Sequence, residues 1–317
     1  MDYLGILTRA LAISWRHKYL WLLALFAGEV TTISLGFGSG SSRNSDNSYS
    51  KESAQAAWTQ LTTWVGAHAA LLWTVGITLA LLGVVLFLIS AIANGALVKA
   101  GAEHDAERPF GLSQAWSAGV QSFWAVLGIK FFGLIVGASL LIVIVGLVLM
   151  TIVFATGGVV AAAIATGVLA GILLLAAIPF FIIFGVAIVL GVRAVVLDGK
   201  GGSEGLRMGV KLIWRRRGRV ALFWLLVCFA GMIASFVAGL AMVVAAAPVV
   251  ALMVAAYFAG GWLLAILAGL TFGTAWLVVT ISLVGGVKAF TSTCWTLAYT
   301  RFDLQAEPAV NTQPQPA

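Results

Sequence analysis

The sequence predicts an all-α polytopic membrane protein with six transmembrane helices in three hairpins, each hairpin preceded by an interfacial amphipathic helix. Three observations lead to this prediction. Of the 317 residues, 62% are apolar and only 9% are charged, whereas soluble domains carry roughly a quarter charged residues. The few charges lie in bands between long uncharged stretches, and a twelve-residue segment recurs along the chain.

The uncharged stretches have the lengths that spans require, since a helix needs about 20 mostly apolar residues to cross a bilayer. Residues 19–37 supply the first candidate span and residues 69–98 the second. Residues 131–192 and 220–287 contain 62 and 68 residues without any charge, so we expect two spans in each. The strands of a membrane barrel alternate strictly over about 10 residues, and these continuous apolar runs do not.

Turn residues divide the two long runs. Gly157-Gly158, after Thr156, interrupts the first run, and Pro248 followed by Gly260-Gly261 interrupts the second. The basic, apolar N-terminus carries no clear small-residue cleavage site, so we interpret it as a retained span rather than a signal peptide.

Basic residues predict the orientation, because Lys and Arg accumulate in cytoplasmic loops. With a cytoplasmic N-terminus, only Arg43 and Lys51 lie outside and the other 16 basic residues lie inside. Those 16 are Arg9, Arg16, Lys18, Lys99, Arg108, Lys130, Arg193, Lys200, Arg207, Lys211, Arg215, Arg216, Arg217, Arg219, Lys288 and Arg301. We therefore expect a multi-pass protein of a bacterial cytoplasmic membrane with both termini cytoplasmic. Topology explains the net charge of +7 without a nucleic-acid partner.

The repeated segment predicts the interfacial helices. SQAWSAGVQSFW (113–124) aligns with SEGLRMGVKLIW (203–214), and Leu7, Leu11 and Trp15 form a fainter third copy that aligns with residues 206, 210 and 214. In the segment 203–214 the apolar residues recur at helical spacing and the basic residues lie on another face, as in a helix lying in the interface plane. Ser113 and Ser203 are the predicted N-caps.

These features predict one membrane domain, residues 1–303, with repeat units of about 1–100, 109–198 and 203–301. Residues 36–53 are rich in Gly, Ser and Asn and predict a flexible external loop. Residues 304–317 contain Pro and Gln and predict a disordered cytoplasmic tail.

Three segments of the chain resemble a known pattern: ISWRHKYLWLLALFAG (13–28), RAVVLDGKGGSEGLRMGVKLIWRRR (193–217) and FTSTCWTLAYTRF (290–302). The chain is similar to six-span bacterial membrane proteins of unknown function related to the membrane domain of glycerophosphodiester phosphodiesterases. The resemblance implies the fold over most of the chain. It implies no hydrolase activity, because the soluble phosphodiesterase domain of that superfamily is absent from this sequence.

A basic cluster at residues 207–219 is the main candidate site. Clusters of four or more basic residues beside a span are typical of sites for anionic lipid headgroups. The same cluster also fits a topology signal, and the two interpretations are compatible. The possible headgroup ligands are Arg207, Lys211, Arg215, Arg216, Arg217 and Arg219.

Polar residues near the spans are the second set of candidates. Glu29 lies inside an apolar segment, where acids are costly to bury and often functional, or it ends the helix and faces external water. Lys130, Arg193 and Lys288 are expected to extend to headgroups, or alternatively to line a path. Apolar sequence continues past Lys288, so either the last helix projects into the cytoplasm or Lys288 lies deeper.

No residue pattern predicts an enzyme, a metal site or a cofactor site. His17, His68 and His104 lie far apart in sequence, and no spacing with Cys or carboxylates indicates metal. The sequence favours a non-enzymatic membrane module that organises lipids or partners at the inner leaflet. The alternative is a transporter or permease for a small molecule, because repeats are common in transporters. A lipid enzyme would need clustered polar residues at one depth.

Overall fold

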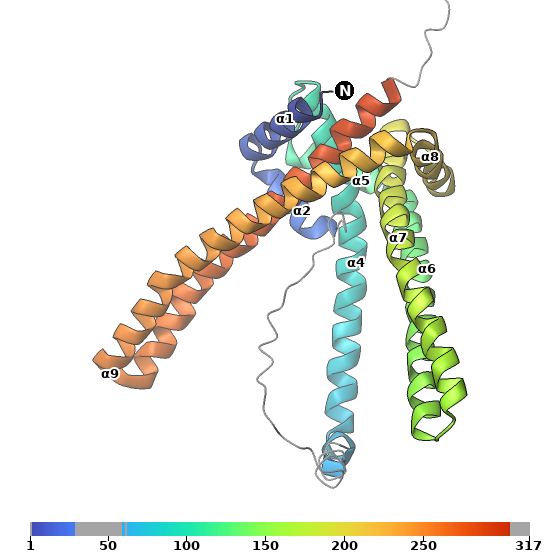
Figure 1. Cartoon of the computed structure of the whole chain (residues 1–317). Helices are drawn as coiled ribbons and strands as arrows, with labels where there is room; N and C mark the ends of the chain where they lie inside the picture. Colours follow the sequence, from blue (N-terminus) through green and yellow to red (C-terminus); the bar gives the residue numbers. More distant parts are fainter. Residues whose placement is uncertain (1, 29–58, 61, 305–317) are drawn as a thin grey trace, which may run out of the picture. The chain divides into compact units, whose positions relative to one another are not determined.

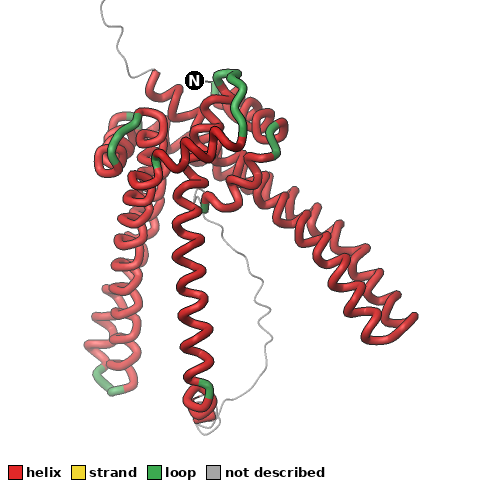
Figure 2. Tube along the Cα trace, turned by 180° about the vertical axis from the view of Figure 1, so that it is seen from behind, coloured by secondary structure: helices red, strands yellow, loops and turns green. Residues whose placement is uncertain are grey.

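The computed structural model describes residues 2–28, 59–60 and 62–304. Regular structure in these residues is entirely helical (Figure 2), which confirms an all-helical protein. Four of the described helices are long and apolar enough to cross a membrane: α4 (Ala69–Asp105), α6 (Phe123–Thr156), α7 (Val160–Asp198) and α9 (Arg217–Leu304). The shorter helices are α1 (Tyr3–Arg16), α2 (Tyr19–Ala27), α5 (Leu112–Gln121) and α8 (Gly202–Arg215), labelled in Figure 1.

The long helices expose apolar side chains along most of their length. Within their most apolar windows, between 0 and 22% of the residues are buried by protein. Water would penalise such a surface by about 25 cal/mol for each Å², so lipid is its appropriate surrounding. These helices therefore belong to a membrane-embedded protein.

The structure divides into two compact units, one of Met1–Thr32 with Ser90–Ala317 and the other of Ile33–Ile89. In the smaller unit, the first part of α4 exposes apolar side chains such as Trp73, and the Trp64 ring stacks on His68 at 4.7 Å. The predicted external loop, 36–53, and the predicted tail beyond Leu304 lie outside the described residues. All other contacts discussed below lie within the larger unit.

Helices α6 and α7 pack along each other on either side of the predicted glycine turn. α6 ends at Thr156, Gly158 has a φ of 76°, and α7 begins at Val160. Close to the turn, Thr151 donates a hydrogen bond of 3.0 Å to the hydroxyl of Thr166. Farther along, a methyl group at Gly133 would lie 2.7 Å from the terminal methyl of Ile188 on α7, so the Ile188 side chain packs over this glycine.

Helix α9 contains a break at Gly260-Gly261 and turns back on itself there (Figure 1). Gly260 has φ −150° and ψ 17°, and Gly261 has φ 70° and ψ −159°, which only glycine adopts readily. Trp276 on the second arm donates a hydrogen bond of 3.1 Å to the carbonyl of Met242 on the first. Pro248 lies within continuous helix, so the predicted contribution of this proline to the turn is wrong.

Helix α2 is shorter than the predicted first span. It comprises nine residues and ends where Gly28 adopts the left-handed conformation with φ 58° and ψ 35°. A helix of that length rises only about 14 Å, roughly half of a bilayer core. The remainder of the predicted 19–37 span, including Glu29, lies outside the described residues.

The core of the larger unit lies where the short helices meet the ends of the long ones. It joins residues of α1, α2, α5 and α8 to the last part of α4 and to α7 and α9. Trp295 and Phe223, from the two arms of α9, meet edge to face at 5.3 Å, and Phe302 contacts Phe223 at 6.1 Å. The apolar sequence after Lys288 is therefore a protein core, which explains why it continues beyond the uncharged run.

The aligned glycines of the repeated segment make equivalent close contacts. A methyl group at Gly209 of α8 would lie 2.5 Å from the carbonyl oxygen of Ala187 on α7. A methyl group at Gly119 of α5 would overlap the carbonyl oxygen of Ile92 on α4. The aligned residue of α1, Ala10, is fully buried, and α1 packs on α9.

The N-caps of α5 and α8 differ from those predicted. Gly111 and Gly201 occupy the cap positions, and Ser113 and Ser203 lie inside the first turns. In α5 the side chain of Gln114 accepts a hydrogen bond of 3.2 Å from the amide of Gly111. The helices begin earlier because extended glycine can precede them without a side-chain cap.

Candidate membrane-interface surface

Helix α8 presents one face to protein and a basic face to its surroundings. Gly205 and Gly209 are buried against α7, whereas Arg207, Lys211 and Arg215 are exposed. These three basic residues recur every four positions and so lie in one stripe along the helix. None of the three has an acidic partner among the described residues, so the stripe carries uncompensated positive charge.

The stripe continues into the corner between α8 and α9. The Arg217 guanidinium lies over the Trp214 ring, with its carbon 5.7 Å from the ring centroid. Arg217 and Arg219 are exposed, and Arg216 is half-buried. The six predicted headgroup residues are therefore brought together, with Arg216 turned partly towards protein.

The three aligned tryptophans are all exposed. Trp15 in α1, Trp124 at the start of α6 and Trp214 in α8 have exposed fractions of 66, 79 and 65%. Exposed tryptophan at the end of a short amphipathic helix suits the headgroup region, where the ring contacts acyl chains and the indole N–H contacts polar groups. We call the surface formed by the exposed basic residues of α8 and its corner with Trp214 the α8 surface.

Lys130 is held by protein rather than extending freely to headgroups. Its Nζ donates hydrogen bonds of 2.6 Å to the carbonyl of Ala27, 2.9 Å to the carbonyl of Ser90 and 2.6 Å to the hydroxyl of Ser90. The cation thus lies at the carbonyl end of α2, where the helix dipole is negative. Lys288 is half-buried at the beginning of the core segment of α9.

Arg193 departs from the expectation that it extends to headgroups. Its side chain is fully buried between α7 and α9. One terminal nitrogen donates a hydrogen bond of 2.7 Å to the carbonyl of Val189, and the other donates to the carbonyl and hydroxyl of Ser292 at 3.0 and 3.2 Å. Buried charges require such partners. The run of Ser and Thr at 291–293 was the sequence signal for a polar site inside the core.

Two histidines far apart in sequence are brought together where the end of α1 meets the last turn of α4. The rings of His17 and His104 stack at 3.7 Å with an angle of 7°. The hydroxyl of Tyr19 lies 2.5 Å from Nε2 of His104. Among the described residues, no group of three or more His, Cys, Asp or Glu side chains could hold a metal ion.

Comparisons with known proteins add no relative to these observations. The chain matches no family model, no curated protein and no solved structure.

Proposed function

We propose that the protein is a six-span, non-enzymatic membrane module of a bacterial cytoplasmic membrane that organises anionic lipids or partners at the inner leaflet. Four of the spans would be α4, α6, α7 and the first arm of α9. The second arm of α9 and a first span beginning with α2 complete the six. The three short amphipathic helices would lie at the cytoplasmic interface, each before one hairpin. The distribution of basic residues supports cytoplasmic termini.

The α8 surface is the observation on which this proposal depends. Arg207, Lys211 and Arg215 project together from a helix whose opposite face is fixed by glycine contacts to α7. Each basic residue near an anionic membrane surface contributes about 1 kcal/mol of attraction. A rigid stripe of three, beside the exposed Trp214 ring, would concentrate anionic headgroups without any conformational change.

The test uses the full chain purified in detergent with its lipids retained. We would compare wild type with Arg207→Gln/Lys211→Gln/Arg215→Gln by native mass spectrometry. A matched control removes the two cations expected on the opposite side, Arg43→Gln/Lys51→Gln. The proposal expects anionic lipid on wild type and on the control, and its loss from the triple variant. Equal lipid retention in all three would reduce the cluster to a topology signal.

A transporter or permease is the second candidate function, and the Lys130 contacts favour it. Discontinuous helix ends inside the membrane bind ions and substrates in transporters, and here the carbonyl end of α2 receives a lysine ammonium. A small molecule retained by wild type in the same mass spectra and lost from Lys130→Met would favour this function over lipid organisation.

A further inference from the structure

An open hollow of about 1260 Å³ lies between α1, the end of α4 and the beginning of α5. Its charged lining comprises Arg9, Arg16, His17, His104, Glu107 and Arg108. We propose that this hollow binds the phosphate group of an anionic ligand. Its lining shares no residue with the α8 surface, so the proposal does not depend on the function assigned to that surface.

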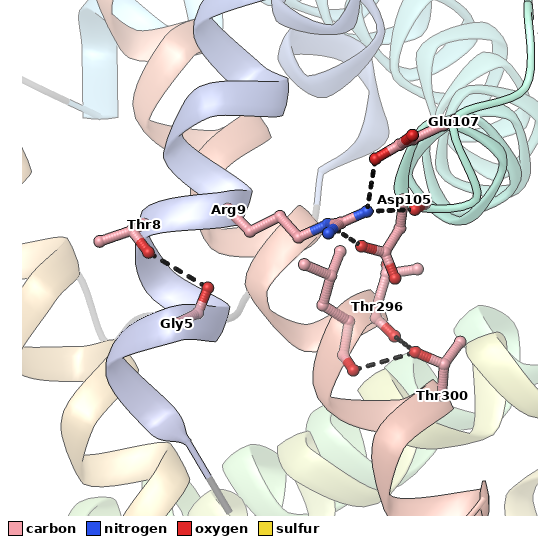
Figure 3. Close-up of polar contacts among 8 residues, drawn as sticks. Gly5, Thr8, Arg9, Asp105, Glu107, Thr296 and Thr300 are labelled. Atoms are coloured by element: carbon pink, nitrogen blue, oxygen red, sulfur yellow. Dashed lines mark hydrogen bonds and ion pairs between the residues drawn. The ribbon is translucent and has the colours of Figure 1, made fainter.

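Two of the arginines are positioned by carboxylates: Arg9 by Asp105 and by Glu107, which itself lines the hollow, and Arg108 by Glu103. Nε of Arg9 lies 2.5 Å from Oδ1 of Asp105, and its Nη2 donates to the Asp105 carbonyl at 2.6 Å (Figure 3). Nη1 of Arg108 lies 3.3 Å from Oε2 of Glu103. Arginine has five N–H donors in a fixed fork, so these pairs orient the guanidinium groups and leave donors for a ligand.

Arg16 supplies the positive charge that is not compensated. It has no acidic partner among the described residues, and its side chain is exposed in the lining. It follows Trp15, whose 66% exposure fits the headgroup region. Arginine binds phosphate oxygens through two parallel N–H bonds, so an exposed guanidinium without an acidic partner suits a phosphate group.

The histidine pair gives the hollow a fixed polar wall. The hydroxyl of Tyr19 donates a hydrogen bond of 3.2 Å to the carbonyl of Phe110 and contacts His104, which in turn stacks on His17. Burial, and secondarily the charge of Arg16, lower the pKa of His17. A neutral imidazole presents one N–H donor, and a bound anion would favour protonation of the ring.

An apolar strip completes the lining and indicates a ligand larger than bare phosphate. Ala12, Ile13, Pro109 and Phe110 line the same hollow as the arginines. This combination accommodates a phosphate with an attached organic group. A phospholipid headgroup and a soluble phosphate ester share this chemistry, and the experiment separates the two sources.

The test uses the full chain in detergent and two probes, inorganic phosphate and phosphatidylglycerol. Phosphate would be titrated against an equal ionic strength of chloride by thermal shift. Phosphatidylglycerol would be compared with phosphatidylcholine by native mass spectrometry. The variants are Arg16→Gln and Arg108→Gln. Lys18→Gln is the matched control, because it removes one exposed cation from the same corner but does not line the hollow.

We expect saturable binding of at least one probe, weakened about fivefold or more by Arg16→Gln and by Arg108→Gln and unchanged by Lys18→Gln. Binding of phosphate alone identifies a soluble ligand, and binding of phosphatidylglycerol without phosphate identifies a headgroup. Equal affinities of Arg16→Gln and Lys18→Gln, or no binding of either probe by the wild type, would overturn the proposal. Size-exclusion profiles matching wild type establish that each variant is folded.

Discussion

The ammonium of Lys130 on α6 lies 2.6 Å from the carbonyl oxygen of Ala27, the last residue of α2. The four last carbonyls of a helix lack partners within the helix, and a buried carbonyl without a partner is costly. Lys130 supplies one such partner and also binds both oxygens of Ser90 on α4. One side chain therefore joins three helices at the point where α2 ends.

Replacing Lys130 with Met is expected to destabilise the protein by about 2–3 kcal/mol, because it leaves helix-end and serine oxygens without their charged donor. Lys288→Met provides the comparison. It removes a half-buried lysine of another apolar helix and is expected to cost less than about 1 kcal/mol. Thermal unfolding in detergent measures both, and equal melting temperatures of the two variants would contradict the structural role of Lys130.

Gly209 tests the packing of α8 on α7. Gly209→Ala places a methyl group 2.5 Å from the Ala187 carbonyl oxygen and 3.0 Å from the Gly191 nitrogen, both of which are backbone atoms. Helix separation must increase, at an expected cost of about 1–3 kcal/mol.

Gly218→Ala is the matched control for this substitution, since no atom lies within 4 Å of its added methyl group. At the second residue of α9, this change is expected to stabilise by no more than about 0.5 kcal/mol. Opposite shifts of the two unfolding midpoints are expected. A Gly209→Ala protein as stable as Gly218→Ala would show that α8 does not approach α7 so closely.

The sequence predicted the elements more successfully than their mutual contacts. Hydrophobic run length and glycine pairs predicted the long helices and the breaks at Gly157-Gly158 and Gly260-Gly261, because these are local properties. The end of α2 at Gly28 was one of two open interpretations, because Glu29 after it fits either the end of a helix or a longer apolar span. Pro248 was misinterpreted because membrane helices tolerate proline.

The candidate site was predictable where it depends on one helix and unpredictable where it joins several. The basic stripe of α8 follows from spacing within fourteen residues. The burial of Arg193 against Ser292 depends on contacts across 99 positions, which periodicity does not encode. The stacking of His17 on His104 is likewise a tertiary contact, so the two residues carried no recognisable spacing.

The stacked histidines predict that stability falls in mild acid. Burial and the charge of Arg16 lower the folded-state pKa of His17, so the unfolded chain binds a proton first. Above the unfolded pKa of about 6.5 both states are neutral and His17 contributes no pH dependence. Below it the unfolded state gains protons, so stability decreases until pH reaches the folded pKa.

The measurement is the melting temperature of wild type and His17→Phe at pH values from 7.5 to 5.5. Phe retains a ring that can stack on His104 but cannot be protonated. We expect the variant to lose less stability on acidification than wild type. Arg9, Arg16, Glu103 and Glu107 remain in both proteins. His104 does not cancel, because burial and the charge of His17 both lower its pKa, and the variant removes the second cause, which acts in the same direction as the expected result. Identical pH profiles would contradict the assignment to His17.

Two tryptophans distinguish the proposed lipid-facing surface from the protein core. Trp295 is 1% exposed and packs edge to face on Phe223, so Trp295→Ala removes a large buried ring and is expected to cost about 3–5 kcal/mol. Trp214 is 65% exposed and contacts Arg217, so Trp214→Ala is expected to change stability in detergent by only about 0.5–1 kcal/mol. In liposomes, with Val210→Cys introduced as a reporter, loss of the Trp214 ring is expected to increase the reaction of that thiol with a water-soluble reagent. Comparable destabilisation by the two substitutions in detergent would show that Trp214 is part of a packed protein interface, and the α8 surface would then not face the membrane.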